Sequence, residues 1–173
     1  MNLSIITCIF GLFIFSPTTV PSFSIGEFNG IEIYSGGDNS VNRSESGYRY
    51  GLKWQCVEFV KRYYFDYLEH TMPNVWGHAI DYFDPSVSHG SMNNSRGLFQ
   101  FENGNKEQPR ENDLLVLNWA EPYGHVAIIS EVTENHIKIA QQNAGPAFIK
   151  LTLTKKNGHY TIGEEAVGWL RKP

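Results

Sequence analysis

Two residues that lie far apart in the sequence have the chemistry of a nucleophile and its base. Cys56 stands in the segment WQCVEF, and His125 stands in the segment YGHVAII. A cysteine attacks as its thiolate, and a histidine within hydrogen-bonding distance can take up the thiol proton. Such a pair can cleave amide bonds through a thioester intermediate. This chemistry requires a fold that brings Cys56 and His125 together.

Cys56 stands at the start of a predicted amphipathic helix that runs over residues 57–68. Its apolar residues recur at spacings of three and four, at Val57, Val60, Tyr64, Phe65 and Leu68. The polar residues between them are predicted to face solvent. The free N–H groups and positive dipole end of a helix N-terminus stabilise a thiolate, and they can bind an oxyanion. The alternative is that Cys56 is a small buried hydrophobic residue.

His125 opens a predicted strand directly after Gly124, whose small size lets another element approach closely. A second strand over residues 137–141 follows in a hairpin. Side chains alternate across a sheet, so one register puts His125 opposite Gln141, and a two-residue shift puts it opposite Asn143. Either amide could accept the imidazole N–H and select the tautomer that acts as a base. Both amides could equally be polar residues at a strand end.

These segments resemble the CHAP family of cysteine, histidine-dependent amidohydrolases and peptidases. The likeness extends over most of residues 31–170 and is greatest to the amidase domain of glutathionylspermidine synthetase/amidase. It rests on the segments GLKWQCVEFVKRYY, GHVAIISEV, IAQQN, NGHYTI and VGWL, in that order. The resemblance implies a papain-like (NlpC/P60-type) fold, with Cys56 as nucleophile and His125 as base. Gln141 stands where the family usually has a glutamate, and Asn143 matches an asparagine that commonly follows.

The amide at Gln141 departs from the family pattern. A carboxylate would stabilise the imidazolium of a thiolate–imidazolium pair, whereas an amide only orients the ring. We therefore expect activity from this chain, and we expect Gln141→Glu to preserve or raise turnover. Trp54 and Gln55 are candidates for the wall of the cleft, and Gln55 is also a candidate oxyanion donor. Ordinary packing and capping would explain both of these residues equally well.

The elements that position these residues are a helix followed by strands. Helix first and hairpin-connected strands afterwards predict an α+β domain in which the catalytic helix packs on an antiparallel sheet. The predicted strands lie over 114–117, 125–130, 137–141, 148–153, 160–162 and 166–170, with a tight turn at Asn157-Gly158. Residues 26–50 are predicted to form an irregular arm. Residues 72–105 are predicted to form loops with one short helix near 79–83.

The start of the chain is predicted to be a secretory signal. Residues 5–15 (IITCIFGLFIF) are almost wholly apolar, and Ser22-Phe23-Ser24 follows at the spacing of a cleavage site. This run is shorter than the ~20 residues that a membrane span needs, so we expect no stable membrane insertion after processing. We predict a signal peptide over residues 1–24, a single CHAP-like catalytic domain over 25–173, and a secreted or periplasmic location. Cleavage would leave Cys56 as the single thiol.

Charge and residue spacing limit the partners. The formal net charge of −4 argues against a nucleic-acid partner. The histidines and aspartates of residues 70–89 match no zinc-ligand spacing, so we expect no metal and no cofactor. The expected partner is a peptide or amide substrate derived from the cell wall. An inhibitor protein is the one macromolecular partner that we allow for.

Three functions remain open from the sequence. The first is an exported cysteine hydrolase, an amidase or endopeptidase, that cleaves amide bonds in peptidoglycan peptides. The second is an amidase of the glutathionylspermidine type, with the same chemistry on a different substrate. The third is a catalytically weak module that binds the cell wall, which the amide at Gln141 would favour.

Overall fold

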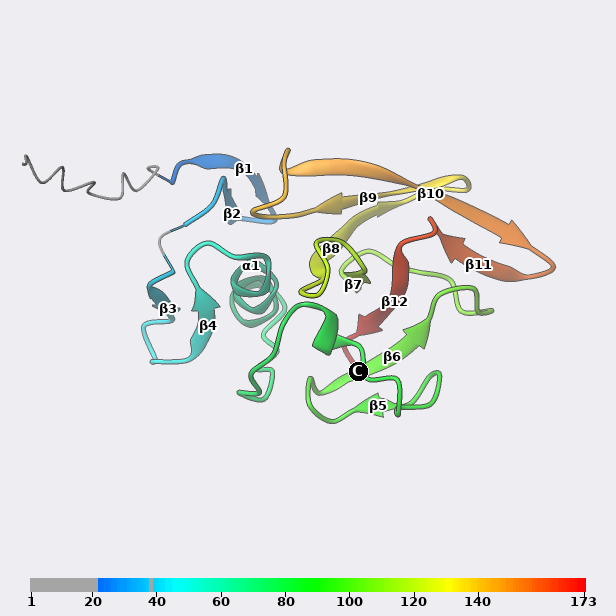
Figure 1. Ribbon diagram of the computed structural model, residues 1–173, viewed down its shortest axis with the longest axis horizontal. Helices are drawn as coiled ribbons and strands as arrows, with labels where there is room; N and C mark the ends of the chain where they lie inside the picture. Colours follow the sequence, from blue (N-terminus) through cyan, green and yellow to red (C-terminus); the bar gives the residue numbers. More distant parts are fainter. Residues whose placement is uncertain (1–21, 38) are drawn as a thin grey trace, which may run out of the picture.

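The computed structural model describes residues 22–37 and 39–173. The predicted signal peptide lies outside these residues, apart from its last three positions. The described residues form an α+β domain with one eight-stranded sheet, two two-stranded sheets and a short helix (Figure 1). Within this part of the chain, no helix is both long enough and apolar enough to cross a membrane.

The main sheet is antiparallel throughout, in the order β11–β10–β9–β8–β7–β12–β6–β5. Its strands are β5 (Met92–Asn93), β6 (Leu98–Glu102), β7 (Leu114–Leu117), β8 (His125–Val132), β9 (His136–Ala140), β10 (Phe148–Lys156), β11 (His159–Ile162) and β12 (Ala166–Arg171). Every strand predicted after residue 110 is therefore confirmed, with ends that differ by at most three residues. The tight turn at Asn157-Gly158 joins β10 to β11, where Lys156 pairs with His159.

Two segments that were predicted to be irregular contain strands. Residues 26–50 contribute to two small antiparallel sheets, β1 (Ser24–Phe28) with β2 (Ile31–Tyr34), and β3 (Val41–Arg43) with β4 (Arg49–Leu52). Strands β5 and β6 lie within the predicted loop region 72–105 and extend one edge of the main sheet. These strands are short and are flanked by Gly, Asn and Ser, so the sequence pattern around them is that of loops.

The predicted helix is shorter and less regular than its periodicity suggests. Helix α1 (Cys56–Arg62) continues as a π-helical turn over Tyr63–Tyr67, and a 3₁₀ turn at Ile80–Tyr82 confirms the predicted short helix. The prediction of a solvated polar face was wrong, because Glu58 and Lys61 are buried. Figure 1 shows the reason: α1 lies between the β3–β4 sheet and the main sheet, which cover it from two sides.

Both faces of the main sheet are covered by apolar side chains. Phe59 of α1 packs in the same cluster as Val126 and Ile128 of β8. The opposite face forms a second cluster, which includes Trp169 of β12. Strand β7 sends alternate side chains into the two clusters, which explains why Leu114–Leu117 is a continuous apolar run. This packing holds the start of α1 against the start of β8.

Candidate active site

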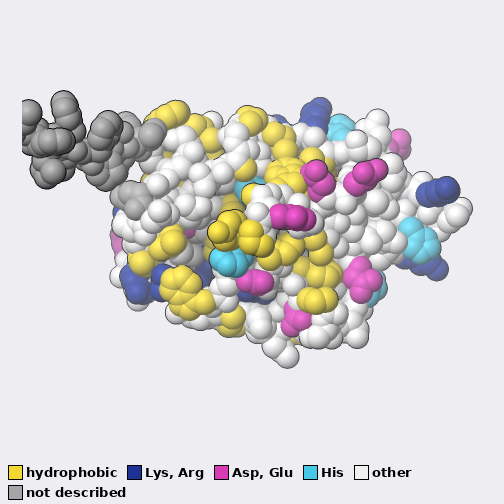
Figure 2. Space-filling view, viewed as in Figure 1, with side chains coloured by type: hydrophobic (Ala, Val, Ile, Leu, Met, Phe, Trp, Pro, Cys, Tyr) yellow, Lys and Arg dark blue, Asp and Glu magenta, His cyan; other side chains and the backbone are white. Residues whose placement is uncertain are grey.

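Cys56 and His125 line the same cavity, which has a volume of about 420 Å³. The cavity opens where the start of α1 meets the start of β8, and residues 74–79 form one wall, with 119–120 and 123–124 forming another. Exposed aromatic side chains stand among its lining residues, with Trp76 66% exposed and Tyr123 56% exposed. Figure 2 shows hydrophobic side chains gathered around a histidine on this face of the molecule.

The thiol of Cys56 is held at the first residue of α1. Gln55 is the N-cap and has an extended backbone, and its side chain makes no capping hydrogen bond. The backbone N–H group of Val126 in β8 is near enough to the sulfur to lower the pKa of the thiol, against the larger effect of burial. Val126 directly follows His125 in the chain. The two distant segments therefore meet at the thiol, as the proposed chemistry requires.

His125 is 5% exposed, and its ring is oriented by Gln141. The His125 Nε2 to Gln141 Oε1 distance is 3.1 Å. The Gln141 amide nitrogen donates to the carbonyl oxygens of Ala144 (2.9 Å) and Pro146 (3.1 Å). Because these two bonds occupy the NH₂ group, the Gln141 oxygen must accept, and the proton of the neutral ring lies on Nε2. The other ring nitrogen, Nδ1, is then unprotonated and can act as a base.

The strand register differs from the simplest prediction. Ile128 pairs with Ala140, with a bulge between Ile129 and Glu131. Continued back to the first residue of β8, this pairing would place His125 opposite Asn143, which is the second of the two predicted registers. Strand β9 ends at Ala140, however, and the side chain of the next residue reaches the imidazole. The His125–Gln141 contact is therefore made beyond the end of the backbone pairing.

Of the three remaining predicted site residues, two line the cavity and one does not. Gln55 and Asn143 both line the cavity, and the Asn143 amide donates to Gln55 Oε1 at 2.7 Å. Gln55 Nε2 in turn donates to Asn39 Oδ1 at 3.1 Å. Trp54 does not line the cavity; its ring stacks on Tyr34 with centroids 3.9 Å apart. Of the six predicted residues, five are brought to one site and Trp54 lies outside it.

Sequence reasoning missed two residues that support the site. The Trp119 ring stacks on the His125 imidazole at 5.4 Å and 18°, and so shields one face of the ring. Gln142 is fully buried and donates to the Gln55 carbonyl (3.0 Å) and to Glu58 Oε2 (2.8 Å). Gln142 thereby ties the start of α1 to the end of β9. Trp119 gave a weak signal as an aromatic residue shortly before His125, whereas nothing in the sequence distinguishes Gln142 from its neighbours.

Burial determines the charge state of the two reactive groups. It raises the pKa of the Cys56 thiol, and the N–H groups of Val126, Val57 and Cys56 oppose this only in part. It lowers the pKa of His125 to about 4, although the Gln141 hydrogen bond acts in the other direction. The depressed thiol pKa expected from the helix N-terminus alone is thus reversed by desolvation. At neutral pH the resting pair is an uncharged thiol and an uncharged imidazole.

The described residues contain no group of three or more His, Cys, Asp or Glu side chains that could hold a metal ion. The groups that the structure brings together around Cys56 are the thiol, the His125 imidazole, side-chain amides and backbone N–H groups. These are the components of covalent catalysis by a thiol.

Comparisons with known proteins agree with the resemblance seen in the motifs. The family model of the CHAP domain matches residues 46–143, which include Cys56, His125, Gln141 and Asn143. The chain is 31% identical over 151 residues to the bifunctional glutathionylspermidine synthetase/amidase of Escherichia coli (strain K12), covering 77% of this chain and 24% of that protein. It is 24% identical over 176 residues to the trypanothione synthetase of Crithidia fasciculata, covering 92% of this chain and 26% of that protein.

The chain thus spans about a quarter of the length of these relatives. The similarity to the synthetase/amidase extends beyond the catalytic motifs, because it covers more of the chain than the family match does. The family match, the relatives and the motif order all agree, and this chain belongs to the CHAP domain family, which includes amide hydrolases.

Proposed function

We propose that this protein hydrolyses amide bonds, with Cys56 as the nucleophile, His125 as the general base and Gln141 as the residue that orients the base. The observation that carries the proposal is the meeting of two segments: the Cys56 and His125 side chains line one cavity, and the Val126 N–H, next to His125, influences the pKa of the Cys56 thiol. The helix-on-sheet arrangement around them is compatible with the papain-like fold that the family resemblance implies.

The uncharged resting pair indicates how the reaction starts. His125 Nδ1 takes the Cys56 proton as the sulfur attacks the amide carbonyl carbon and forms a C–S bond. The C–N bond then breaks, and the amine leaves with the proton from His125. Water attacks the thioester with His125 again as base, which releases the acid and returns the proton to the sulfur. Gln141 keeps the reactive nitrogen facing the thiol through this cycle.

The oxyanion formed in each attack needs N–H donors. The backbone N–H groups at the start of α1 are available because a helix N-terminus leaves them without intrahelical partners. Gln55 adds a second source, since among the described residues its amide nitrogen donates only to Asn39. The Asn143 bond to Gln55 Oε1 fixes which end of that amide faces outward. We therefore assign Gln55 as an oxyanion donor and Asn143 as the residue that positions it.

For the substrate we propose amide bonds of peptidoglycan peptides, with the protein secreted or periplasmic. The apolar run at residues 5–15 supports export, and export would place the enzyme beside the cell wall. The alternative is a conjugate of the glutathionylspermidine type. The similarity to a bifunctional glutathionylspermidine synthetase/amidase favours this alternative. A binding module with little turnover is the remaining candidate.

A digestion experiment distinguishes these functions. Purified peptidoglycan and glutathionylspermidine are each incubated with the wild type, Cys56→Ala and His125→Ala, and products are identified by mass spectrometry. We expect cleavage of an amide bond by the wild type and a loss of at least about a thousandfold in both variants. His159→Ala, which removes an exposed histidine outside the cavity, is the control and should retain full activity. If the wild type binds a wall fragment but releases no product from either substrate, the binding module is the correct reading.

A further inference from the structure

We infer that the end of the active-site cavity formed by Arg49, Lys61 and Tyr82 binds an anionic group of the substrate, namely a carboxylate. The inference rests on the proposed function and adds to it a substrate class: amides that carry a carboxylate a few bonds from the scissile carbonyl. All three side chains line the same cavity as Cys56 and His125.

The first observation is the charge of the side chains that line the cavity. Arg49 and Lys61 line the cavity, and no Asp or Glu is found among its described lining residues. The chain as a whole has a formal net charge of −4, so this cationic lining runs against the average of the molecule. Such a local excess of positive charge attracts anionic ligands.

Lys61 is a buried cation, which is unusual for a lysine. It is 5% exposed, and among the described residues no carboxylate forms an ion pair with it. Its ammonium group lies 4.8 Å from the centre of the Tyr48 ring. Burial and the neighbouring charges of Arg96 and Arg49 lower its pKa to about 8. A buried ammonium without a counter-ion is costly, and a ligand carboxylate would remove that cost.

Tyr82 supplies an independent observation at the same place. It is 1% exposed, and its hydroxyl has no hydrogen-bond partner among the described residues. A buried hydroxyl without a partner is unfavourable, so native structures usually satisfy it with a protein group, a water or a ligand. The guanidinium of Arg96 stacks on the Tyr82 ring at 3.8 Å, which adds positive charge next to this hydroxyl. A ligand carboxylate could accept the Tyr82 O–H.

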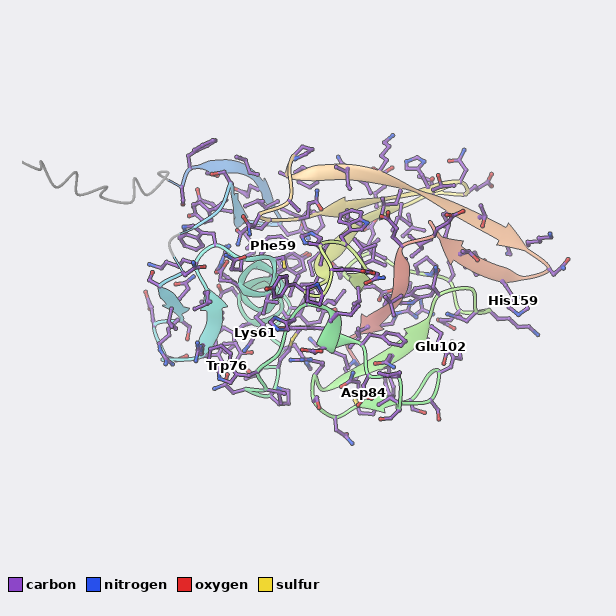
Figure 3. The ribbon with its side chains drawn as sticks, in the orientation of Figure 1. Phe59, Lys61, Trp76, Asp84, Glu102 and His159 are labelled. Atoms are coloured by element: carbon purple, nitrogen blue, oxygen red, sulfur yellow. The ribbon has the colours of Figure 1, made fainter. Side chains whose placement is uncertain are left out.

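The fold fixes the distance between this subsite and the reactive sulfur. Lys61 follows Cys56 by five residues on α1, and a rise of about 1.5 Å per residue separates their backbones by roughly 7 Å along the helix axis. Arg49 is held in place by its stack on Trp76 at 3.7 Å. In Figure 3 the labelled Lys61 and Trp76 lie on the same side of α1. The carboxylate would therefore lie a few bonds from the atom under attack.

Alkylation of Cys56 tests the subsite without requiring turnover. The protein is treated with maleimidoacetic, maleimidopropionic and maleimidohexanoic acids, each compared with its uncharged primary amide, and labelling of the Cys56 peptide is followed by mass spectrometry. We expect one chain length to label Cys56 about tenfold faster as the acid than as the amide, the factor that a charge-assisted hydrogen bond supplies. The acid should lose this advantage in Lys61→Met and Arg49→Gln.

Tyr82→Phe is the most discriminating variant, because it removes one oxygen that has no partner in the protein. A merely structural Tyr82 would leave the acid-to-amide ratio unchanged, whereas the subsite predicts that the ratio falls. Arg110→Gln, which removes a positive charge outside the cavity, is the matched control and should keep the wild-type ratio. Equal rates for acid and amide at every chain length would overturn the inference. The amide-hydrolysis proposal would survive that result, and selective labelling without any hydrolysis would instead remove the hydrolase and leave the subsite.

Discussion

Both the oxygen and the nitrogen of the Gln141 side-chain amide make hydrogen bonds. Its oxygen accepts from His125, while its nitrogen donates to the carbonyl oxygens of Ala144 and Pro146. A glutamate at this position would keep the first contact and lose the other two. One carboxylate oxygen would then face two backbone carbonyl oxygens, with no donor between them. The loop over residues 144–146 thus favours an amide at this position, and the expectation that Gln141→Glu preserves or raises turnover stays a prediction.

We predict that Gln141→Glu lowers the free energy of unfolding by about 1–3 kcal/mol at pH 7, because two buried hydrogen bonds are lost and a charge is placed beside two carbonyls. Urea denaturation followed by fluorescence measures this. Asn143→Asp makes the same chemical change at an exposed neighbour that donates a single bond, and it should cost less. A Gln141→Glu protein as stable as the wild type would show that the loop rearranges around the acid.

The reactive residues were predictable from their types, and their electrostatics were not. A cysteine before a helix and a histidine at a strand start are visible in the sequence. The raised thiol pKa depends on how completely residues 74–79, 119–120 and 123–124 cover the site, and these segments carry no regular pattern. The tautomer of His125 depends on two loop carbonyls that no side-chain motif encodes.

At the scale of the elements, the start of β8 is placed by a close contact with the 3₁₀ turn. Gly124 has φ +70°, and a Cβ there would lie 2.7 Å from the backbone nitrogen of Ile80. The Ile80 N–H also donates to the Tyr123 carbonyl at 2.9 Å. The approach expected from a glycine before His125 is therefore present, and its partner is the Ile80–Tyr82 turn.

We predict that Gly124→Ala lowers the free energy of unfolding by at least about 2 kcal/mol and slows amide hydrolysis, because the clash displaces the backbone next to His125. Gly158→Ala is the control: it has a similar φ of +78° but open space around its Cβ position. The control should show the backbone cost alone, about 1 kcal/mol, with unchanged hydrolysis. Thermal melting and a turnover assay on both variants measure the difference. If both variants behave alike, the contact with Ile80 does not position His125.

The strands were predictable where the pattern of apolar residues and the residues of the adjoining turn indicate the same structure. Residues 114–117 form a continuous apolar run because both faces of β7 are buried, and Asn157-Gly158 is a strong hairpin signal. Strands β5 and β6 were missed because they are short and lie between glycine-rich turns. The end of α1 was missed because the apolar spacing continues through the π-helical turn at Tyr63–Tyr67.

At the scale of the whole molecule, His125 links the site to global stability. Its pKa is about 4 in the folded protein and 6.5 when exposed. Between these values the unfolded chain binds a proton that the folded chain excludes, so stability falls as the pH is lowered from 6.5 to 4. Above pH 6.5 both states hold the neutral ring, and this effect is absent. The full loss is about 3 kcal/mol.

We therefore predict that the free energy of unfolding of the wild type decreases more steeply between pH 6.5 and pH 4 than that of His125→Gln, which has no titrating ring. Urea denaturation at several pH values gives both slopes. Carboxylates titrate in the same range in both proteins, so the difference between the slopes isolates His125. Parallel slopes would mean that the imidazole is protonated in the folded state as readily as in water.

The order of strands in the main sheet has a consequence for synthesis on the ribosome. Strand β12 lies between β7 and β6, although it is translated after both of them. Until Ala166–Arg171 leaves the exit tunnel, the edges of β6 and β7 that pair with β12 have unpaired backbone N–H and C=O groups. These edges can pair with strands of other chains. The main sheet is therefore completed late in synthesis. A polypeptide that ends before Ala166 would leave the β6 and β7 edges unpaired and prone to aggregation.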